Sequence, residues 1–179
     1  MSEFITGIDF ILGGARSGKS VMAEQRARAS GKRIVYIATA EARDGEMQNR
    51  IAHHRGRRPS HWQTVEEPLH LAQALRAHQS PDHLILVDCL TLWLSNLLCR
   101  DDHELFLRQT TDLLDHLHQS QPNVILVSNE TGLGVVPMGE LSRRFVDEAG
   151  WLHQSIAARA RRVTLMVAGL PLLLKNTGQ

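Results

Sequence analysis

The sequence contains few cysteines, few aromatic residues and no long apolar segment. Its two cysteines, Cys89 and Cys99, form no CxxC pair, and no signal peptide is visible, so we expect reduced thiols and a cytoplasmic protein. Aromatic residues make up 4% of the chain and the formal net charge is +1, which predicts neither nucleic acid nor an anionic membrane as a partner. The longest apolar segment, 163–174, is interrupted by Gly169 and Pro171 and is shorter than the roughly 20 residues of a membrane-spanning helix. No membrane anchor is therefore expected.

A single α/β domain is the predicted architecture. The 179 residues fit one domain and 42% of them are hydrophobic, so residues 1–179 are expected to form one core. Strand-like runs such as IVYIAT and LILVD are continuously apolar, as in strands covered on both faces, and longer helical stretches separate them. This pattern predicts a mostly parallel sheet flanked by helices. The expected strands are 10–12, 33–39, 84–87, 123–128 and 163–168, and the expected helices are 20–29, 68–78, 104–118 and 138–160.

The most specific local motif is GGARSGKS, which matches the phosphate-binding pattern GxxxxGK[ST] in full. It follows a strand-like run and opens a helical stretch, and this context argues against a chance match in a glycine-rich turn. Backbone N–H groups and the N-terminus of a helix supply the converging donors that a chain of phosphates requires. Lys19 is expected to reach the β- and γ-phosphates, and the Ser20 hydroxyl to bind Mg²⁺. The motif predicts a nucleoside triphosphate site formed by Gly13, Gly14, Ala15, Arg16, Ser17, Gly18, Lys19 and Ser20.

Asp88 ends the apolar run LILVD, so its carboxylate is expected at the carboxyl edge of the sheet, where α/β proteins bind ligands. An acid at that place is suited to hold Mg²⁺, directly or through water. The alternative is that Asp88 caps a helix beginning near Leu90, because helix N-caps favour the same residue type. Thr39 and Glu130 also follow strand-like runs, and each is expected either to face this edge or to cap a turn.

Residues 50–59 read RIAHHRGRRP and combine two adjacent histidines with four arginines. They belong to the segment 41–67, which fits the strand and helix pattern least well and contains one short possible strand at 63–65. A metal site is a poor explanation, because neighbouring helical positions point about 100° apart and no cysteine or carboxylate lies at ligand spacing. A covalent site suits the run better, since a neutral imidazole can attack phosphorus while arginines stabilise the charge on its oxygens. A nucleic-acid patch and a solvated basic turn remain open as alternatives.

Taken together, these motifs resemble those of the bifunctional adenosylcobinamide kinase and adenosylcobinamide-phosphate guanylyltransferase family of cobalamin synthesis. A phosphate-binding loop alone indicates only a nucleotide, whereas the HHRxxRP and NExGxGxxP patterns are far more selective. The matching segments cover nearly the whole chain: GGARSGKS at 13–20, YIATA at 36–40, RIAHHRGRRPSHW at 50–62, VDCLTLWLSNLL at 87–98, VSNETGLGVVP at 127–137 and AGLPLLLK near the carboxyl end.

The resemblance implies a RecA-like P-loop fold, a homotrimer and a set of site residues. It implies that His53, the first histidine of the pair, carries GMP as a phosphoramidate, and that Glu66 and Asp88 are acidic contacts. The other GTP contacts that it implies are Gly13 to Ser20, Ala38, Thr39, Ala40, His54, Arg55, Gly56 and Arg57.

The implied chemistry has two steps. GTP or ATP first gives its γ-phosphoryl group to the hydroxyl of the aminopropanol arm of adenosylcobinamide, with Lys19 and Mg²⁺ offsetting charge. His53 then attacks the α-phosphorus of GTP, pyrophosphate leaves, and adenosylcobinamide phosphate takes the GMP to give adenosylcobinamide-GDP. Two alternatives stay open: a simple small-molecule kinase without a covalent intermediate, and an ATP-switched module that binds nucleic acid or a protein through residues 50–58.

Overall fold

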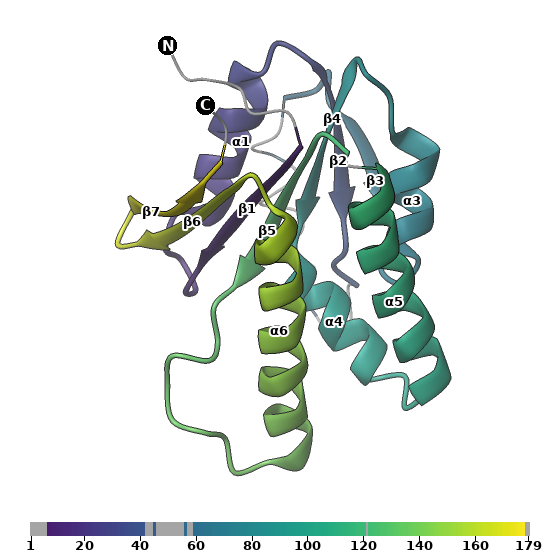
Figure 1. Cartoon of the computed structure of the whole chain (residues 1–179), viewed down its shortest axis with the longest axis vertical. Helices are drawn as coiled ribbons and strands as arrows, with labels where there is room; N and C mark the ends of the chain where they lie inside the picture. Colours follow the sequence, from purple (N-terminus) through teal and green to yellow (C-terminus); the bar gives the residue numbers. More distant parts are fainter. Residues whose placement is uncertain (1–6, 42–44, 46–55, 57–58, 121, 178–179) are drawn as a thin grey trace.

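The computed structural model describes residues 7–41, 45, 56, 59–120 and 122–177, and the strands of this part form one seven-stranded sheet (Figure 1). The strand order is β3-β2-β4-β5-β1-β6-β7. Neighbouring strands from β3 to β6 are parallel, and β7 is antiparallel to β6, so the predicted mostly parallel sheet is confirmed. The strands are β1 (Ile8–Gly13), β2 (Arg33–Ala38), β3 (Gln63–Glu66), β4 (His83–Asp88), β5 (Val124–Asn129), β6 (Arg162–Val167) and β7 (Leu170–Asn176).

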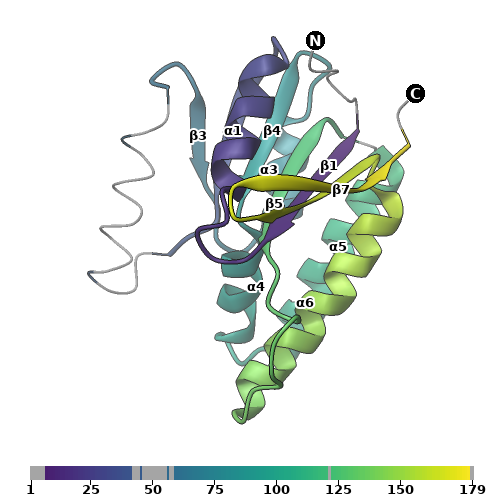
Figure 2. The same ribbon diagram turned by 90° about the vertical axis from the view of Figure 1, so that its left-hand side faces the viewer.

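Helices cover both faces of the sheet. The helices α3, α4, α5 and α6 pack on one face, whereas α1 packs on the other and lies in front of the sheet in Figure 2. Within the described residues, no helix is both long and apolar enough to cross a membrane. The bounds are α1 (Lys19–Ala29), α3 (Leu71–His78), α4 (Leu90–Leu98), α5 (His103–Ser120) and α6 (Glu140–Arg159).

Successive residues of a strand enter different cores. Phe10 and Leu12 belong to the core beneath α3 to α6, while Ile11 between them belongs to the core beneath α1. This alternation follows from the pleat of a β-strand, which points neighbouring side chains to opposite faces. Because helices cover both faces, both sets of positions are apolar, and this is the physical reason for the continuously apolar runs in the sequence.

The hairpin of β6 and β7 differs from the prediction, which places no strand after residue 168. Val167 pairs with Leu170, so the turn contains only Ala168 and Gly169, with φ of 51° and 81°. A two-residue turn with positive φ at both positions matches the twist of the strands that it joins. Pro171 is tolerated because β7 is an edge strand. Gly169 and Pro171 are therefore a turn and the beginning of a strand, not interruptions of one apolar segment.

A buried ion cluster joins β1, α1 and β6 near the amino-terminal ends of the two strands. Asp9 is 3% exposed and accepts hydrogen bonds from Arg26 at 2.8 Å and from Arg162 Nε at 3.1 Å. Arg26 also donates to the Thr164 hydroxyl at 3.0 Å. Two cations thus share one carboxylate, which fixes α1 against the sheet at the end opposite to the phosphate-binding motif.

Candidate nucleotide site

The phosphate-binding motif forms the loop between β1 and α1. β1 ends at Gly13 and α1 begins at Lys19, so the motif has the strand and helix context that it requires. Gly18 precedes the helix with φ of 97°, a left-handed conformation that favours glycine. Gly18, the N-cap residue, has no side chain to cap α1, and the first turn of α1 contains no acidic residue. The first N–H groups of α1 are therefore open to an anion.

Close packing around the loop and one buried hydroxyl fit a bound phosphate. A Cβ atom on Gly13 would lie 2.5 Å from the Met166 carbonyl oxygen and 2.6 Å from Ser17 Oγ, so a side chain cannot be placed there without movement. Gly14 has open space around it. Within the described part of the chain, the buried Ser17 hydroxyl has no hydrogen-bond partner. A phosphate oxygen would supply that partner, so the residues present fit a nucleoside triphosphate.

Lys19 is folded back onto this loop. Its ammonium group donates to the Gly14 carbonyl oxygen at 2.6 Å, and the residue is only 7% exposed. Burial lowers the pKa of Lys19, and the neighbouring Cys89 and Asp88 act in the opposite direction. Burial also raises the pKa of the Cys89 thiol to about 11, so this thiol stays protonated at neutral pH.

Asp88 lies at the carboxyl end of β4, which β5 separates from β1. Its Oδ2 atom accepts a hydrogen bond from the Tyr36 hydroxyl at 2.9 Å. Cys89, and not Asp88, is the N-cap residue of α4, so the alternative in which Asp88 is the N-cap of this helix is wrong. One carboxylate and the Ser20 hydroxyl are donors that suit Mg²⁺ beside a nucleotide. The chemistry of the two residues therefore fits the predicted metal.

The carboxyl ends of β2 and β3 lie at the same edge of the sheet as Asp88. Ala38, the last residue of β2, is in register with Asp88 on one side and with Glu66 on the other. The fully buried Thr39 hydroxyl accepts from the Cys89 N–H at 2.9 Å and donates to the Cys89 carbonyl oxygen at 2.7 Å. Thr39 thus holds the backbone that follows Asp88. Contacts with the nucleotide stay predictions for Ala38, Thr39, Ala40 and Glu66.

Glu130 lies beside the loop, directly after β5. Its backbone N–H donates to the Gly13 carbonyl oxygen at 3.0 Å, and its Oε1 atom accepts from the Gly132 N–H at 2.6 Å. Both roles expected for Glu130 are therefore present, because it faces the carboxyl edge and caps a turn.

A buried polar pair behind this edge has no counterpart among the predicted site residues. Ser128 Oγ lies 2.8 Å from His153 Nε2 and 3.2 Å from Thr91 Oγ1, and Thr91 Oγ1 accepts from the Asn129 N–H at 2.7 Å. These contacts connect α6 with the backbone at the end of β5. The polar Ser128 and Asn129 after an apolar run were the available signal, but His153 lies 25 residues away on a helix.

His153 predicts a loss of stability in mild acid. Burial lowers the pKa of His153, and the negative charge of Glu130 opposes this shift. The unfolded chain therefore binds a proton at higher pH than the folded protein, so the free energy of unfolding falls as the pH drops below about 6.5. His153→Gln, which has no imidazole to titrate, is expected to show a flatter decrease. Urea unfolding at several pH values between about 7 and 5 measures both slopes.

The free energy of unfolding of His153→Gln is still expected to fall with decreasing pH, because a second histidine is buried. Burial also lowers the pKa of His116, which contributes in the same direction. Equal slopes for the wild type and His153→Gln would contradict the assignment to His153.

The histidine and arginine run lies outside the described residues. This applies to His53, His54, Arg55 and Arg57, whereas Gly56 is described and is helical and exposed. The covalent role, the nucleic-acid patch and the basic turn all stay predictions for this run.

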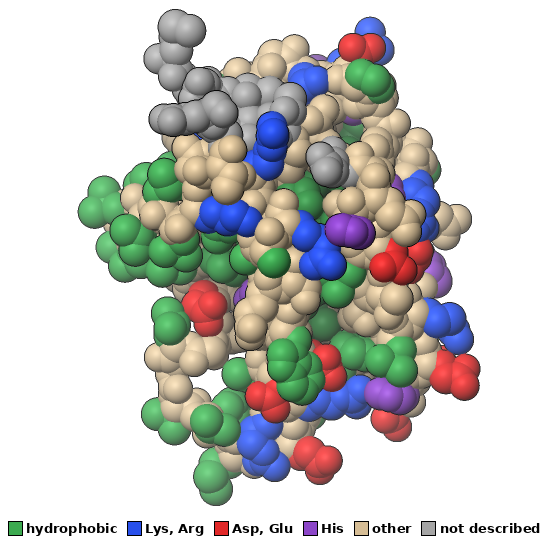
Figure 3. All heavy atoms as spheres, in the orientation of Figure 1, with side chains coloured by type: hydrophobic (Ala, Val, Ile, Leu, Met, Phe, Trp, Pro, Cys, Tyr) green, Lys and Arg blue, Asp and Glu red, His purple; other side chains and the backbone are tan. Residues whose placement is uncertain are grey.

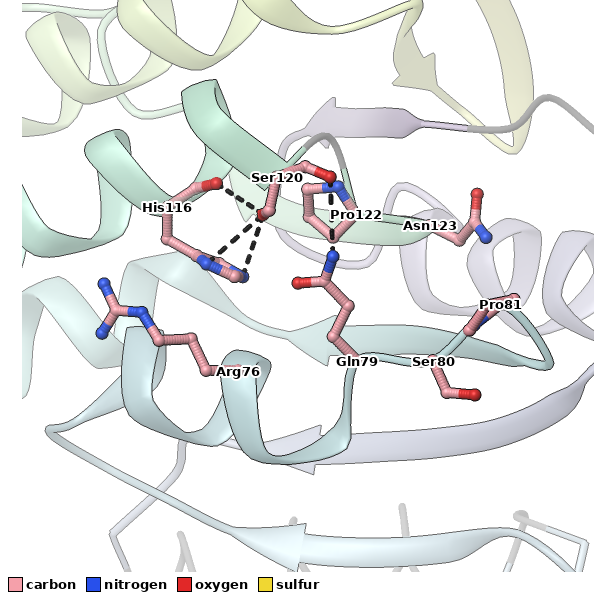
Figure 4. Close-up of a pocket in the computed structure, with 8 residues that line it drawn as sticks. All are labelled: Arg76, Gln79, Ser80, Pro81, His116, Ser120, Pro122 and Asn123. Atoms are coloured by element: carbon pink, nitrogen blue, oxygen red, sulfur yellow. Dashed lines mark hydrogen bonds between the residues drawn. The ribbon is translucent and has the colours of Figure 1, made fainter.

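A polar hollow of about 540 Å³ lies at the opposite, amino-terminal edge of the sheet, between the ends of α3 and α5 (Figure 4). Its polar groups bond to protein neighbours. The Ser120 hydroxyl donates to the His116 carbonyl oxygen at 2.7 Å, and Arg76 forms an ion pair with Asp112. The loop, where donors are open, is therefore the better candidate for the nucleotide site than this hollow.

Comparisons with known proteins identify the family. Residues 9–174 match a family model described as cobinamide kinase / cobinamide phosphate guanyltransferase. The chain is 62% identical over 168 residues to the bifunctional adenosylcobalamin biosynthesis protein CobP of Pseudomonas aeruginosa, which covers 94% of this chain and 97% of the relative. It is 38% identical over 178 residues to the bifunctional adenosylcobalamin biosynthesis protein CobU of Escherichia coli, with 92% and 98% covered.

Solved structures confirm the predicted RecA-like P-loop fold. The RadB recombinase superposes with a TM-score of 0.52 at 16% identity, covering 89% of this chain and 74% of that chain. The flagellar accessory protein FlaH of Methanocaldococcus jannaschii gives 0.58 at 12% identity, covering 97% and 81%. Sequence identities this low show only that the fold is shared. The family is shown by the sequence matches to the family model and to the two bifunctional relatives. The chain therefore belongs to the cobinamide kinase / cobinamide phosphate guanyltransferase family.

Proposed function

We propose that this protein phosphorylates adenosylcobinamide and then transfers GMP from GTP to the adenosylcobinamide phosphate. The family match supports both activities, since the relatives are named as bifunctional proteins of adenosylcobalamin biosynthesis. The observation that carries the nucleotide half is the loop itself, with an uncapped helix N-terminus, a buried Ser17 hydroxyl that has no partner among the described residues, and Lys19 close to Asp88. The predicted cytoplasmic location belongs to the same proposal.

In the kinase step, the γ-phosphoryl group of GTP or ATP moves to the hydroxyl of the aminopropanol arm. The bond between the γ-phosphorus and the β–γ bridging oxygen breaks, a new oxygen–phosphorus bond forms, and the hydroxyl proton is released. Lys19 stabilises negative charge on the β- and γ-phosphates, and the N–H groups of the loop orient them. Ser20 and Asp88 are the residues that would hold Mg²⁺, which neutralises phosphate charge when it is bound.

In the guanylyl step, His53 is the proposed nucleophile. A ring nitrogen attacks the α-phosphorus of GTP, the α–β phosphoanhydride bond breaks and pyrophosphate leaves. A phosphate oxygen of adenosylcobinamide phosphate then attacks the same phosphorus, the phosphorus–nitrogen bond breaks, and adenosylcobinamide-GDP is released. Arg55 and Arg57 are proposed to stabilise the α-phosphate, and His54 and Gly56 to contact GTP.

We also propose the homotrimer that the family resemblance implies, and two exposed apolar surfaces support association of subunits. The hairpin surface consists of Val167, Leu170, Leu172, Leu173 and Leu174, and the loop surface of Leu133, Val135, Val136, Met138 and Leu141. Figure 3 shows apolar side chains over both regions on the same side of the molecule. Exposed apolar patches of this kind mark protein interfaces. The hairpin turn also touches the phosphate-binding loop, since the Gly169 N–H donates to the Ser17 carbonyl oxygen at 3.0 Å.

The experiment that tests the proposed function uses GTP labelled at the α-phosphate. The purified protein is incubated with Mg²⁺ and labelled GTP and then denatured, and we expect protein-bound label that is stable in alkali and released by acid, as a phosphoramidate is. GTP labelled at the γ-phosphate is expected to leave no label on the protein. If GTP binds but no α-label is retained, the simple kinase is the better account. Salt-sensitive binding of single-stranded nucleic acid without labelling would favour the nucleotide-switched module.

A further inference from the structure

Tyr36 and Asp88 form a side-chain contact that the proposed chemistry does not yet use. The Tyr36 hydroxyl donates to Asp88 Oδ2 at 2.9 Å, and the Tyr36 residue is 1% exposed. A carboxylate in contact with a buried phenol group has one oxygen occupied by a neutral donor. The contact brings an apolar-core residue of β2 into the nucleotide site.

The sheet itself explains how this contact arises. Ala38 is in register with Asp88 across the parallel pair of β2 and β4, so Tyr36 lies two residues earlier on the same face of β2. The Tyr36 ring belongs to the core beneath α1, which also begins at the phosphate-binding loop. A tyrosine ring is long enough to lie in this core and still place its hydroxyl at the carboxyl edge, where Asp88 ends β4.

The second carboxylate oxygen of Asp88, Oδ1, indicates what the contact between Tyr36 and Asp88 does. Asp88 Oδ1 accepts no hydrogen bond from any residue that the structure describes, whereas Oδ2 is held by Tyr36. The negative charge of Asp88 acts on Lys19 of the loop. Since the Tyr36 hydroxyl fixes Oδ2, the carboxylate has one defined orientation and its Oδ1 atom stays available at the nucleotide edge.

The backbone that follows Asp88 is also held by hydrogen bonds from the end of β2. The Thr39 hydroxyl bonds both the N–H and the carbonyl oxygen of Cys89, and the Asn96 side chain donates to the Thr39 carbonyl oxygen at 2.7 Å. β2 thus fixes the main chain after Asp88 through Thr39, and the Asp88 side chain through Tyr36. A residue that only filled the core would need no hydroxyl at this point, and phenylalanine would serve equally well.

We propose that Tyr36 is a positioning residue that orients the Asp88 carboxylate for the metal ion of the metal–nucleotide complex. This inference rests on the proposed role of Asp88 as the metal-holding acid. Groups that hydrogen-bond to metal ligands set the orientation of those ligands and tune the affinity for the metal. Loss of the Tyr36 hydroxyl therefore weakens metal binding and leaves the phosphate contacts of the loop in place.

The test measures Mn²⁺ binding directly, by the loss of the free Mn²⁺ signal in electron paramagnetic resonance. The protein is saturated with a GTP analogue that carries a methylene group in place of the α–β bridging oxygen, and no corrinoid is added. We expect Tyr36→Phe to weaken the Mn²⁺ affinity of this complex by about tenfold. The affinity for the analogue without metal is expected to stay unchanged. In phosphoryl transfer, the variant is expected to need about tenfold more Mg²⁺ for half-maximal rate and to recover its rate at high Mg²⁺.

Thr164→Val is the matched control, since it also removes a buried hydroxyl from the sheet without changing the size of the side chain. Thr164 accepts from Arg26 away from the loop, so its loss is expected to lower stability and leave Mn²⁺ affinity unchanged. An equal loss of affinity in Tyr36→Phe and Thr164→Val would overturn the inference, because both would then act through general destabilisation.

Asp88→Asn separates failure of the inference from failure of the proposed function. If Asp88→Asn weakens Mn²⁺ binding and Tyr36→Phe does not, the positioning role of Tyr36 is wrong and the metal role of Asp88 stands. If Asp88→Asn binds Mn²⁺ as the wild type does, the proposed metal role of Asp88 fails, and the inference fails with it.

Discussion

His53→Ala is expected to lose guanylyl transfer and the GMP label on the protein while retaining phosphoryl transfer. A covalent route has no substitute for its nucleophile, so the rate of guanylyl transfer is expected to fall by roughly 10⁴-fold or more. The kinase step uses the γ-phosphoryl group and the loop at Gly13 to Ser20, and it requires no histidine nucleophile. Separate assays of phosphoryl transfer to adenosylcobinamide and of GMP transfer to adenosylcobinamide phosphate measure the two effects.

His61→Ala provides the control for this variant. His61 is an exposed histidine in the same part of the chain and has no proposed role in either step. It is expected to retain both the label and the two activities. Normal guanylyl transfer by His53→Ala would show that the covalent mechanism is wrong, and loss of both activities would show that the two steps share this residue.

Lys19→Ala is expected to reduce both reactions by about 10³-fold, because one cation serves the phosphates in each step. The side chain is held only by the Gly14 carbonyl oxygen among the hydrogen bonds of the described residues, so its removal is expected to leave the fold intact. Initial rates of the two half-reactions at saturating nucleotide, together with thermal unfolding, measure these effects.

Lys32→Ala is the matched control for the loss of a lysine. Lys32 donates to the Pro81 carbonyl oxygen near the amino-terminal edge of the sheet, away from the phosphate-binding loop, and both rates are expected to stay near the wild-type values. A defect of Lys19→Ala that is confined to one reaction would contradict the proposal that one nucleotide site serves both steps.

Several parts of the fold and the site could be predicted because their causes are local in the chain. The runs IVYIAT and LILVD predicted buried parallel strands, since strands covered on both faces need apolar side chains at successive positions. The glycines and Lys19 of the loop were recognisable because a phosphate site needs a set of residues at fixed spacing between a strand and a helix. The position of Asp88 at the carboxyl edge followed from its place at the end of an apolar run.

Other features depended on partners that are distant in sequence. The hairpin of β6 and β7 was missed because Gly169 and Pro171 disrupt an apolar pattern, and only pairing with β6 shows that they form a turn and an edge strand. The role of Asp88 as a helix cap could be rejected only once Cys89 was seen to be the N-cap residue of α4.

The sequence by itself determined the fold class, the phosphate-binding loop and the family, since each depends on residue types at short and fixed spacing. Only the tertiary structure decided which side chains meet at the nucleotide site. Tyr36 reaches Asp88 across 52 positions of sequence, and Ser128 reaches His153 across 25. Such contacts are set by strand order, register and helix packing, which arise from burial of the whole core and leave no periodic signal in the chain.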